Sequence, residues 1–309
     1  MRKKVTIVGS GNVGATAAHW IASKELADVV LIDIIDGVPQ GKALDLLEAM
    51  PIEKRDSHVI GTNDYADTAN SDIVVITAGI PRKPGQSRDD LVGSNLPIIQ
   101  NVADNAKKHC PDAFVIVISN PLDAMVYEYK RRVGAPREKV VGMAGVLDSA
   151  RFSLFLAREV GASIKDVRAT VLGGHGDDMV PVLGYTTING IPVQQLIKAD
   201  RLAAIIDRTR KGGGELVGLM GTSAYYAPAA SAIAMAEAYL NDEKRILPAA
   251  AYLEGEYGYK DLYLGVPVVI GAGGVEKILE IELSAAEKSM LKTSADSVQK
   301  VVDIVKAKS

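Results

Sequence analysis

Short runs of nearly uninterrupted apolar residues alternate with helical stretches through the first half of this 309-residue chain. Runs of this kind, rich in β-branched residues, are typical of parallel strands that are covered on both faces. The predicted strands are 4–8, 29–32, 59–60, 72–77, 113–119 and 140–143, and the predicted helices are 13–24, 40–50, 96–109 and 122–133. Because strands and helices alternate, the pattern predicts an α/β fold with a doubly wound parallel sheet.

The regular alternation ends near residue 144, which predicts a second, mixed α+β domain without a flexible linker before it. A helix is expected at 149–160, and residues 210–214, Arg-Lys-Gly-Gly-Gly, are expected to interrupt a later helical segment. Strand-like pieces are expected at 167–172, 185–188, 249–252, 262–264 and 266–270, and the last helix is expected to begin with the capping-box pattern Ser284-Ala285-Ala286-Glu287. We therefore expect domains at 1–144 and 145–309.

The composition limits the classes of protein to which the chain can belong. Lys+Arg 35 against Asp+Glu 38 gives a net charge of -3, which provides no overall attraction to nucleic acid or to an anionic membrane. The longest apolar run, 224–240, contains Pro228 and Glu237, so it predicts a packed helix rather than a membrane span. The single cysteine, Cys110, cannot form an internal disulfide, and no Cys/His cluster has the spacing of metal ligands. With no signal peptide visible, we expect a cytoplasmic protein.

The first predicted strand runs directly into Gly9-Ser10-Gly11-Asn12-Val13-Gly14 and then into a helix. The pattern G-x-G-x-x-G between a strand and a helix is the fingerprint of a dinucleotide-binding Rossmann domain. Gly9 permits the tight turn, Gly11 lets the backbone approach a pyrophosphate, and Gly14 allows the helix and the strand to pack closely. We expect the free N–H groups of this loop to hold the phosphates.

Asp33 ends the second predicted strand, nineteen residues past Gly14, where a carboxylate can accept hydrogen bonds from the adenosine ribose. An anion there repels a 2′-phosphate and no arginine occurs in the next three residues, 34–36, so NAD is favoured over NADP as the cofactor. Asp36 is a rival for the ribose but lies past the strand end. A second glycine-rich segment, 271–274, also follows a strand, but Glu276 takes the place of the third glycine and a turn is expected.

His175 is one of four histidines and lies in a glycine-flanked segment, Leu172-Gly173-Gly174-His175-Gly176-Asp177-Asp178. A side chain that can take up a proton near neutral pH is what the oxidation of an alcohol requires. We expect its orienting carboxylate to come from elsewhere in the chain. Asp148 is the candidate, and it could equally be the N-cap of the helix that follows it. Arg151, one turn further, could bind a substrate carboxylate or form a surface salt bridge.

Residues 77–90 follow the fourth predicted strand, at the edge of the sheet where ligands bind in folds of this kind. Two glycines and two prolines punctuate the segment, and Arg82 and Arg88 add two fixed positive charges. Such a basic loop could simply be solvated. A lid that closes on a charged substrate is the sharper hypothesis.

Taken together and in order along the whole chain, the segments 9–14, 77–90, 118–123, 147–152 and 173–178, with Asp33, resemble the lactate/malate dehydrogenase family. Within it they are most similar to the bacterial malate dehydrogenases that share the lactate dehydrogenase architecture. The resemblance implies reversible, NAD-dependent oxidation of (S)-malate to oxaloacetate. It also implies a homo-oligomer, with a tetramer favoured over a dimer.

The resemblance assigns roles to individual residues of this sequence. It implies that His175 accepts the proton, that Asp148 orients its ring, and that Arg88 polarises the reacting oxygen while Arg151 holds the C1 carboxylate. The other implied contacts are Asn120 with both substrate and nicotinamide, Asn95 with the cofactor, and the backbone of Ile118 and Ser119 with the cofactor.

Arg82 is the residue expected to select the substrate. Lactate dehydrogenases resemble this segment but carry a glutamine at the corresponding place. A guanidinium can pair with the second carboxylate of malate, whereas with pyruvate it would be enclosed without a partner, which is costly. Two other functions stay open at this stage: a dehydrogenase of lactate or another 2-hydroxy acid, and an NAD-binding sensor without catalytic activity.

Overall fold

The computed structural model describes residues 2–81 and 88–308, with Arg88 and Asp89 described by their backbone only. Its main feature is one nine-stranded sheet with the strand order β14-β13-β12-β6-β5-β4-β1-β2-β3. The six strands from the first half of the chain are β1 (Lys4–Val8), β2 (Asp28–Ile32), β3 (Val59–Thr62), β4 (Ile73–Ile76), β5 (Phe114–Val117) and β6 (Val140–Gly142). All of their pairings with one another are parallel, so the predicted doubly wound sheet is confirmed.

The strands β1, β4 and β5 form the buried centre of this sheet. All four residues of β4 and of β5 are buried, and the large side chains Ile7, Ile76 and Phe114 are fully enclosed. This burial on both faces explains why these strands are continuously apolar rather than alternating.

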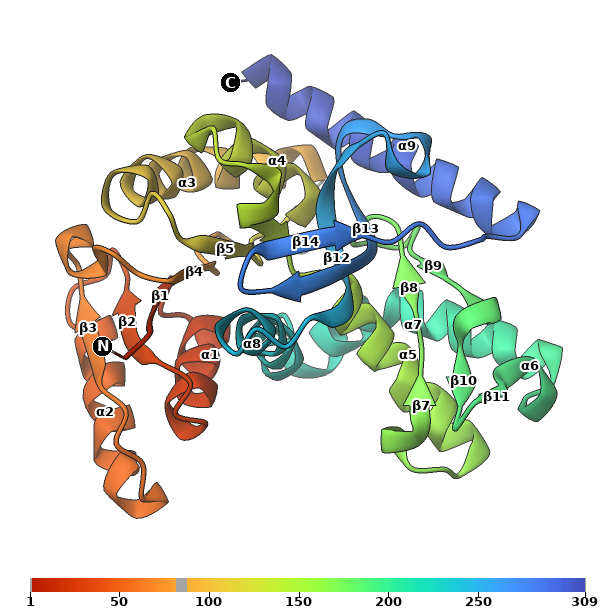
Figure 1. Cartoon of the computed structure of the whole chain (residues 1–309), viewed down its shortest axis with the longest axis horizontal. Coiled ribbons are helices and arrows are strands. Elements are labelled where there is room, and N and C mark those ends of the chain that lie inside the picture. The colour runs from red at the N-terminus through yellow and green to blue at the C-terminus, as the bar shows by residue number, and fades with distance from the viewer. Residues whose placement is uncertain (1, 82–87, 309) are drawn as a thin grey trace.

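Helices cover both faces of the sheet (Figure 1), with α3, α4 and α9 together on one side and α1 packed against α8 on the other. The helices of the first half are α1 (Asn12–Ser23), α2 (Val38–Glu53), α3 (Arg88–His109) and α4 (Leu122–Val133). Three of them lie where the sequence predicts them, whereas α3 begins eight residues earlier than expected.

Three strands of the second half extend the same sheet. The strands β12 (Arg245–Glu254), β13 (Lys260–Gly271) and β14 (Gly274–Ile278) are antiparallel, and β12 joins the parallel part by pairing with β6. The two expected strands 262–264 and 266–270 are therefore one long strand. The segment 271–274 is the turn between β13 and β14, as predicted.

The remaining strands are short and form two small sheets. They are β7 (Val167–Arg168), β8 (Val171–Leu172), β9 (Val180–Pro181), β10 (Thr187–Ile188) and β11 (Ile191–Pro192). The single strand expected at 167–172 is thus wrong, because β7 and β8 pair with different partners. The expected strand 185–188 is reduced to β10.

The other helices are α5 (Gly145–Val160), α6 (Val193–Leu196), α7 (Ala199–Met220), α8 (Tyr226–Leu240) and α9 (Ala285–Lys308). The prediction that residues 210–214 interrupt a helix is wrong, because α7 continues through them. The apolar run near 224–240 is the packed helix α8, with Ile233 and Met235 in the core. At the start of α9, Ser284 and Glu287 form the predicted capping box. Among the helices within residues 2–81 and 88–308, none is both long and apolar enough to cross a membrane.

Candidate active site

His175 lies in the loop after β8 and contacts a carboxylate from another element. Its Nδ1 is 2.9 Å from Oδ2 of Asp148, which lies on α5. Because a carboxylate only accepts hydrogen bonds, this contact places the proton of the neutral ring on Nδ1 and leaves Nε2 with a free lone pair. The ring side chain keeps 19% of its surface exposed, whereas Asp148 keeps 3%. The structure therefore gives the histidine an accessible basic nitrogen and a buried orienting group.

The alternative that Asp148 is the N-cap of a helix is wrong. The helix α5 begins at Gly145 and its N-cap is Ala144, so Asp148 lies inside the first turn. Its second oxygen, Oδ1, is 3.5 Å from the guanidinium of Arg151 one turn later. The N-terminus of a helix favours a negative charge. The carboxylate is thus held between a histidine, an arginine and the helix end.

The electrostatic environment favours the protonated ring of His175. Burial lowers the pKa of this imidazole, but the charge and hydrogen bond of Asp148 and the charge of Asp123 raise it, and the net shift is upward from its usual value of 6.5. Arg151 opposes this with a smaller effect. The ring is consequently a stronger base than a free histidine.

Arg151 is enclosed rather than part of a surface salt bridge. Its side chain is 12% exposed, and its Nη1 donates to the carbonyl oxygen of Thr209 on α7 at 3.4 Å. Gly212, one turn further along α7, leaves the space that the guanidinium occupies, since a Cβ there would lie 2.4 Å from Arg151 Cδ. The glycines expected to break this helix thus include one that makes room for a functional side chain.

Three successive amides of the histidine loop are held by three different elements. The N–H of Gly173 donates to the carbonyl oxygen of Gly265 on β13 at 2.8 Å. The N–H of Gly174 donates to Ser294 Oγ on α9, and that of His175 donates to Asp123 Oδ2 on α4, each at 2.9 Å. The position of the ring is therefore fixed by the packing of both halves of the chain.

Two further residues of this loop's surroundings, Asp123 and Ser294, are not predicted from the sequence. Asp123 lies within the segment 118–123 that carries the family resemblance, three residues after the expected site residue Asn120. Its place in this segment was the signal available from the sequence. Nothing in the sequence near Ser294 indicates its contact with a loop 120 residues away.

The glycine-rich loop between β1 and α1 has the geometry of a dinucleotide site. A Cβ on Gly14 would lie 1.8 Å from the carbonyl oxygen of Gly9, and one on Gly9 would lie 2.8 Å from the amide nitrogen of Ala78. Gly11, in contrast, faces open space. Gly9 and Gly14 are therefore required by packing, whereas Gly11 leaves an unobstructed approach to the N-terminus of α1. That terminus has no side-chain cap and no acidic residue in its first turn, so it can accept a pyrophosphate.

Asp33 lies directly after β2 beside this loop. Its Oδ2 accepts hydrogen bonds from the backbone N–H and the hydroxyl of Ser10, at 2.6 and 2.8 Å. Partial burial raises the pKa of the Asp33 carboxyl, but the two Ser10 hydrogen bonds and those of nearby amides outweigh it, and the net shift is downward from 3.8. Lys42 of α2 donates to the carbonyl oxygen of Ser10 at 2.5 Å. These contacts of Ser10 and Lys42 were not expected from the sequence.

Asn95 lies within α3, and Asn120 lies in the turn that follows β5. The side chain of Asn95 is buried and bonds the N–H and the carbonyl oxygen of Ile80 and the carbonyl oxygen of Asn120. It thus fixes the start of the predicted lid to the β5–α4 turn, and its contact with a cofactor stays a prediction. Asn120 is exposed and precedes a cis peptide bond to Pro121. Ser119 donates to the carbonyl oxygen of Ala78 at 2.5 Å, and Ile118 donates to that of Ile76 at 2.8 Å.

Two predicted substrate residues have no described side chain. Arg82 lies outside the described residues, and of Arg88 the structure gives only its place as the first residue of α3. Their roles stay predictions that rest on the sequence.

The proposed cofactor part of the site, residues 9–14 and Asp33, and the part around His175 meet at the carboxyl edge of the sheet. The strand order reverses between β1 and β4, which is where ligands bind in doubly wound sheets. The β5–α4 turn carries Asn120, and the helix α4 that follows it carries Asp123, which accepts the backbone N–H of His175. The residues present therefore fit a bound dinucleotide at this edge of the sheet.

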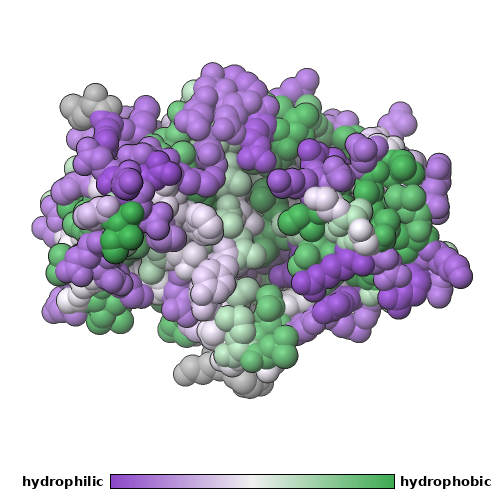
Figure 2. All heavy atoms as spheres, turned by 90° about the horizontal axis from the view of Figure 1, so that it is seen from below, coloured by the Kyte–Doolittle hydropathy of each residue, from purple (hydrophilic) through white to green (hydrophobic). Residues whose placement is uncertain are grey.

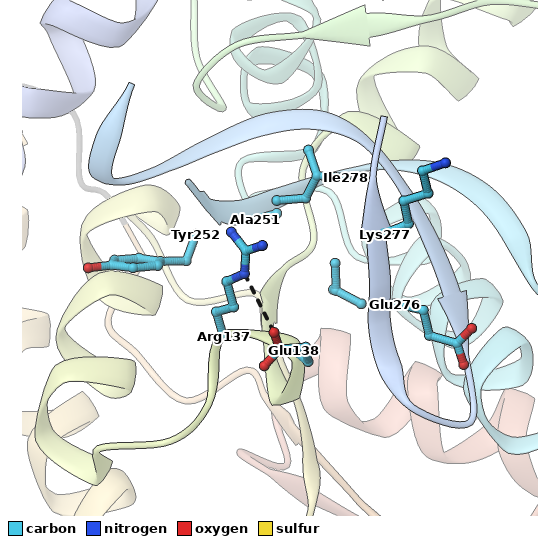
Figure 3. Close-up of a pocket in the computed structure, with 8 residues that line it drawn as sticks. Arg137, Glu138, Ala251, Tyr252, Glu276, Lys277 and Ile278 are labelled. Atoms are coloured by element: carbon cyan, nitrogen blue, oxygen red, sulfur yellow. Dashed lines mark ion pairs between the residues drawn. The ribbon is translucent and has the colours of Figure 1, made fainter. Parts of the chain in front are cut away.

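A small cavity on another part of the molecule plays no part in this site. It has a volume of about 40 Å³ and lies between the turn before β6 and the strands β12 and β14, lined by Arg137, Glu138 and Glu276 among others. Figure 3 shows that Arg137 points toward Glu138, with which it forms an ion pair. Within the described part of the chain, no group of three or more His, Cys, Asp or Glu side chains is placed to hold a metal ion.

Comparison with known proteins agrees with this geometry. The malate dehydrogenase of Sorangium cellulosum is 63% identical over 310 aligned residues, covering 100% of this chain and 99% of the relative. The solved malate dehydrogenase of Cryptosporidium parvum superposes with a TM-score of 0.97 at 49% identity, covering 99% of this chain and 100% of that one.

A lactate dehydrogenase from the same organism, solved with lactic acid and NAD, is almost as similar. It gives a TM-score of 0.96 at 45% identity, covering 99% of this chain and 98% of that one. The overall fold therefore does not distinguish the two substrates. Residues 3–142 match the NAD binding domain of the lactate/malate dehydrogenase family, and residues 145–309 match its alpha/beta C-terminal domain. With the glycine loop, Asp33 and the His175–Asp148 pair in place, the chain belongs to the lactate/malate dehydrogenase family.

Proposed function

We propose that the protein is an NAD-dependent malate dehydrogenase that interconverts (S)-malate and oxaloacetate. The observation that carries the reaction type is the 2.9 Å contact of His175 with the buried Asp148, next to the enclosed Arg151. The substrate follows from the full-length similarity to a bacterial malate dehydrogenase at 63% identity.

In malate oxidation, His175 accepts the proton of the C2 hydroxyl group at Nε2 while the C2–H bond breaks and the C2=O bond forms. Bound NAD supplies the acceptor for the hydride that leaves C2. Asp148 stabilises the resulting imidazolium through its contact with Nδ1. In the reverse direction the imidazolium returns the proton to the carbonyl oxygen, so one residue serves as base and as acid.

Three arginines orient the dicarboxylate. The guanidinium of Arg151 lies one turn from Asp148, and we assign to it the bidentate binding of the C1 carboxylate. From the sequence, Arg88 stabilises the negative charge that develops on the carbonyl oxygen, and Arg82 pairs with the distal carboxylate. Fixing both ends of the substrate supplies the orientation that the transfer requires.

The cofactor is held by the backbone of residues 9–14 and by Asp33. The hydrogen bonds from Ser10 keep the Asp33 carboxyl ionised. A negative charge at this place accepts ribose hydroxyl hydrogen bonds and repels a 2′-phosphate, which favours NAD. Asn120, Asn95, Ile118 and Ser119 complete the proposed contacts at the nicotinamide end.

The test is a comparison of four assays with purified protein: oxaloacetate or pyruvate, each with NADH or NADPH. The proposal expects efficient turnover only with oxaloacetate and NADH. A higher kcat/KM with pyruvate would instead identify a lactate dehydrogenase. Saturable NADH binding without turnover of any 2-oxoacid would identify a sensor, which would not need the His175–Asp148 pair.

We further propose that the chain acts in the cytoplasm as a homo-oligomer, a tetramer in preference to a dimer. Figure 2 shows apolar patches separated by hydrophilic residues on one face of the protein. Several large hydrophobic side chains are exposed, among them Leu219, Tyr226 and Ile246. Exposed apolar patches are typical of subunit contacts. We also propose the division into functional parts at 1–144 and 145–309.

A further inference from the structure

Asp123 is a buried carboxylate that the mechanism above does not use. It lies in the first turn of α4, and its Oδ2 accepts the backbone N–H of His175 at 2.9 Å. Its other oxygen, Oδ1, is buried and has no hydrogen-bond partner within residues 2–81 and 88–308. The carboxylate of Asp123 therefore uses only one of its two oxygens as a hydrogen-bond acceptor within the described residues.

The one hydrogen bond that Asp123 makes does not require a charge. An asparagine has nearly the same shape, and its carbonyl oxygen accepts an amide N–H equally well. Burying a carboxylate with a free oxygen costs more than burying an amide. The use of aspartate at this place consequently points to a use for its negative charge.

Among the charged groups whose side chains the structure describes, the charges around the ring are balanced only when His175 is protonated. The charged groups of the described residues that act on the ring are Asp123 from α4 and Asp148 and Arg151 from α5. The helix α9 contributes the uncharged Ser294 to the loop, and β13 contributes the backbone of Gly265. With a neutral ring, two carboxylates face one guanidinium and one negative charge is left over. Uptake of a proton by the ring removes this imbalance.

We propose that Asp123 is a positioning residue of the proton-accepting unit: it fixes the backbone of His175 and its charge stabilises the protonated ring that malate oxidation produces. The inference deepens the proposed function and rests on it. Asp148 acts on the ring through a direct contact, whereas Asp123 acts through the backbone and through space.

The electrostatics of the pair agree with this assignment. The pKa of Asp123 is raised from 3.8 to about 6, mainly by burial and also by the charge of Asp148, while the hydrogen bond and charge of His175 lower it. The charge of Asp123 in turn raises the pKa of His175. The protonation of each group therefore depends on the charge of the other.

The test compares Asp123→Asn with two controls. The first control, Asp178→Asn, removes an exposed carboxylate three residues after His175. In the described part of the chain this carboxylate accepts a hydrogen bond from Ser297. The second, Ser294→Ala, removes the neighbouring loop hydrogen bond without changing a charge. The readout is the NMR titration of the His175 ring in the protein without ligands, assigned against His175→Asn, since the chain has only four histidines.

We expect Asp123→Asn to lower the ring pKa by about one unit, the effect of removing a nearby opposite charge. The rising limb of the pH profile of kcat/KM for malate should move to lower pH by the same amount. Neither control should move the ring pKa, although Ser294→Ala should reduce turnover. An unchanged ring pKa in a folded Asp123→Asn variant would overturn the proposal, because only a structural role would then be left.

Measurements that leave Asp123 in place cover the case in which Asp123→Asn does not fold. The 13C signal of the Asp123 carboxyl should shift as the His175 ring titrates, and the pKa of Asp123 should rise in His175→Asn, which lacks the positive charge. A signal that is indifferent to the ring overturns the proposal. These titrations need neither cofactor nor substrate, so they give a result even if the protein does not oxidise malate, an outcome that would overturn only the proposed function.

Discussion

Gly212 on α7 packs directly against the guanidinium of Arg151 on α5, at a distance that admits no side chain. A Cβ at this position would lie 2.6 Å from Arg151 Nε and 3.2 Å from Cζ. The helix tolerates glycine here, with its lower helix propensity, because the absence of a side chain makes room for the group that we propose holds the C1 carboxylate.

Gly212→Ala should therefore displace Arg151 and raise KM for oxaloacetate, with a loss in kcat/KM on the order of 100-fold, the effect of a misplaced binding group. The measurement is steady-state kinetics. Gly213→Ala is the matched control, because a Cβ there meets nothing within 4 Å and helix propensity improves equally. Equal kinetics for the two variants would show that Gly212 is not needed for this space.

Asp148→Asn should lower kcat by about 10²–10⁴-fold, because the ring of His175 would lose its orienting charge. His175→Asn should show a similar loss and still bind NADH, which fluorescence titration can measure. Turnover near the wild-type value in either variant would contradict the proposed proton transfer.

The charge of Asp33 predicts cofactor selectivity. Asp33→Asn should raise the ratio of kcat/KM for NADPH over that for NADH by about tenfold or more, since repulsion of the 2′-phosphate is removed. Asp36→Asn removes an exposed charge three residues away and should leave the ratio unchanged. A change in the control and not in Asp33→Asn would move the ribose contact to Asp36.

Arg82→Gln should shift preference from oxaloacetate toward pyruvate by about 100-fold or more in the ratio of kcat/KM values. The distal carboxylate of oxaloacetate would lose its partner, and a site occupied by pyruvate would no longer enclose an unpaired guanidinium. Lys83→Gln removes one positive charge from the adjacent position and serves as the control. The assay pairs both oxoacids with NADH, and an unchanged ratio would count against Arg82.

The raised pKa of His175 sets the pH dependence of the two directions. Malate oxidation needs the neutral ring, so its kcat/KM should rise with pH through a midpoint above 6.5. Oxaloacetate reduction needs the imidazolium, so its kcat/KM should fall through the same midpoint. A midpoint below 6.5 in both directions would mean that burial outweighs the carboxylates.

The sequence predicts the parallel half of the sheet well, because buried β-branched runs and the glycine loop are local features. It fails where tertiary contacts outweigh local preference. Residues 210–214 look like a break, yet α7 continues because Gly212 packs against Arg151. The start of α5 at Gly145 is similarly hidden, since a glycine is a poor signal for a helix start.

For the site, the sequence identifies His175, Asp148 and Arg151, and the structure brings these three together. It gives no indication that Ser10 Oγ donates to Asp33 or that Ser294 accepts from the histidine loop, and it includes Asp123 in the segment 118–123 without indicating its contact with His175. These partners are between 23 and 120 residues apart in the chain. Contacts across such separations depend on how helices and strands pack, which local patterns do not encode.

The histidine loop is tied to β13, α9 and α4 through three consecutive amides, and this has a consequence for inactivation. Slight loosening of any one of these elements, by heat or urea, would tilt the imidazole before much helix or strand is lost. Activity should accordingly be lost at a lower temperature than the far-ultraviolet circular dichroism signal. Loss of turnover would then report loosened packing of the C-terminal helix before the helix itself unfolds.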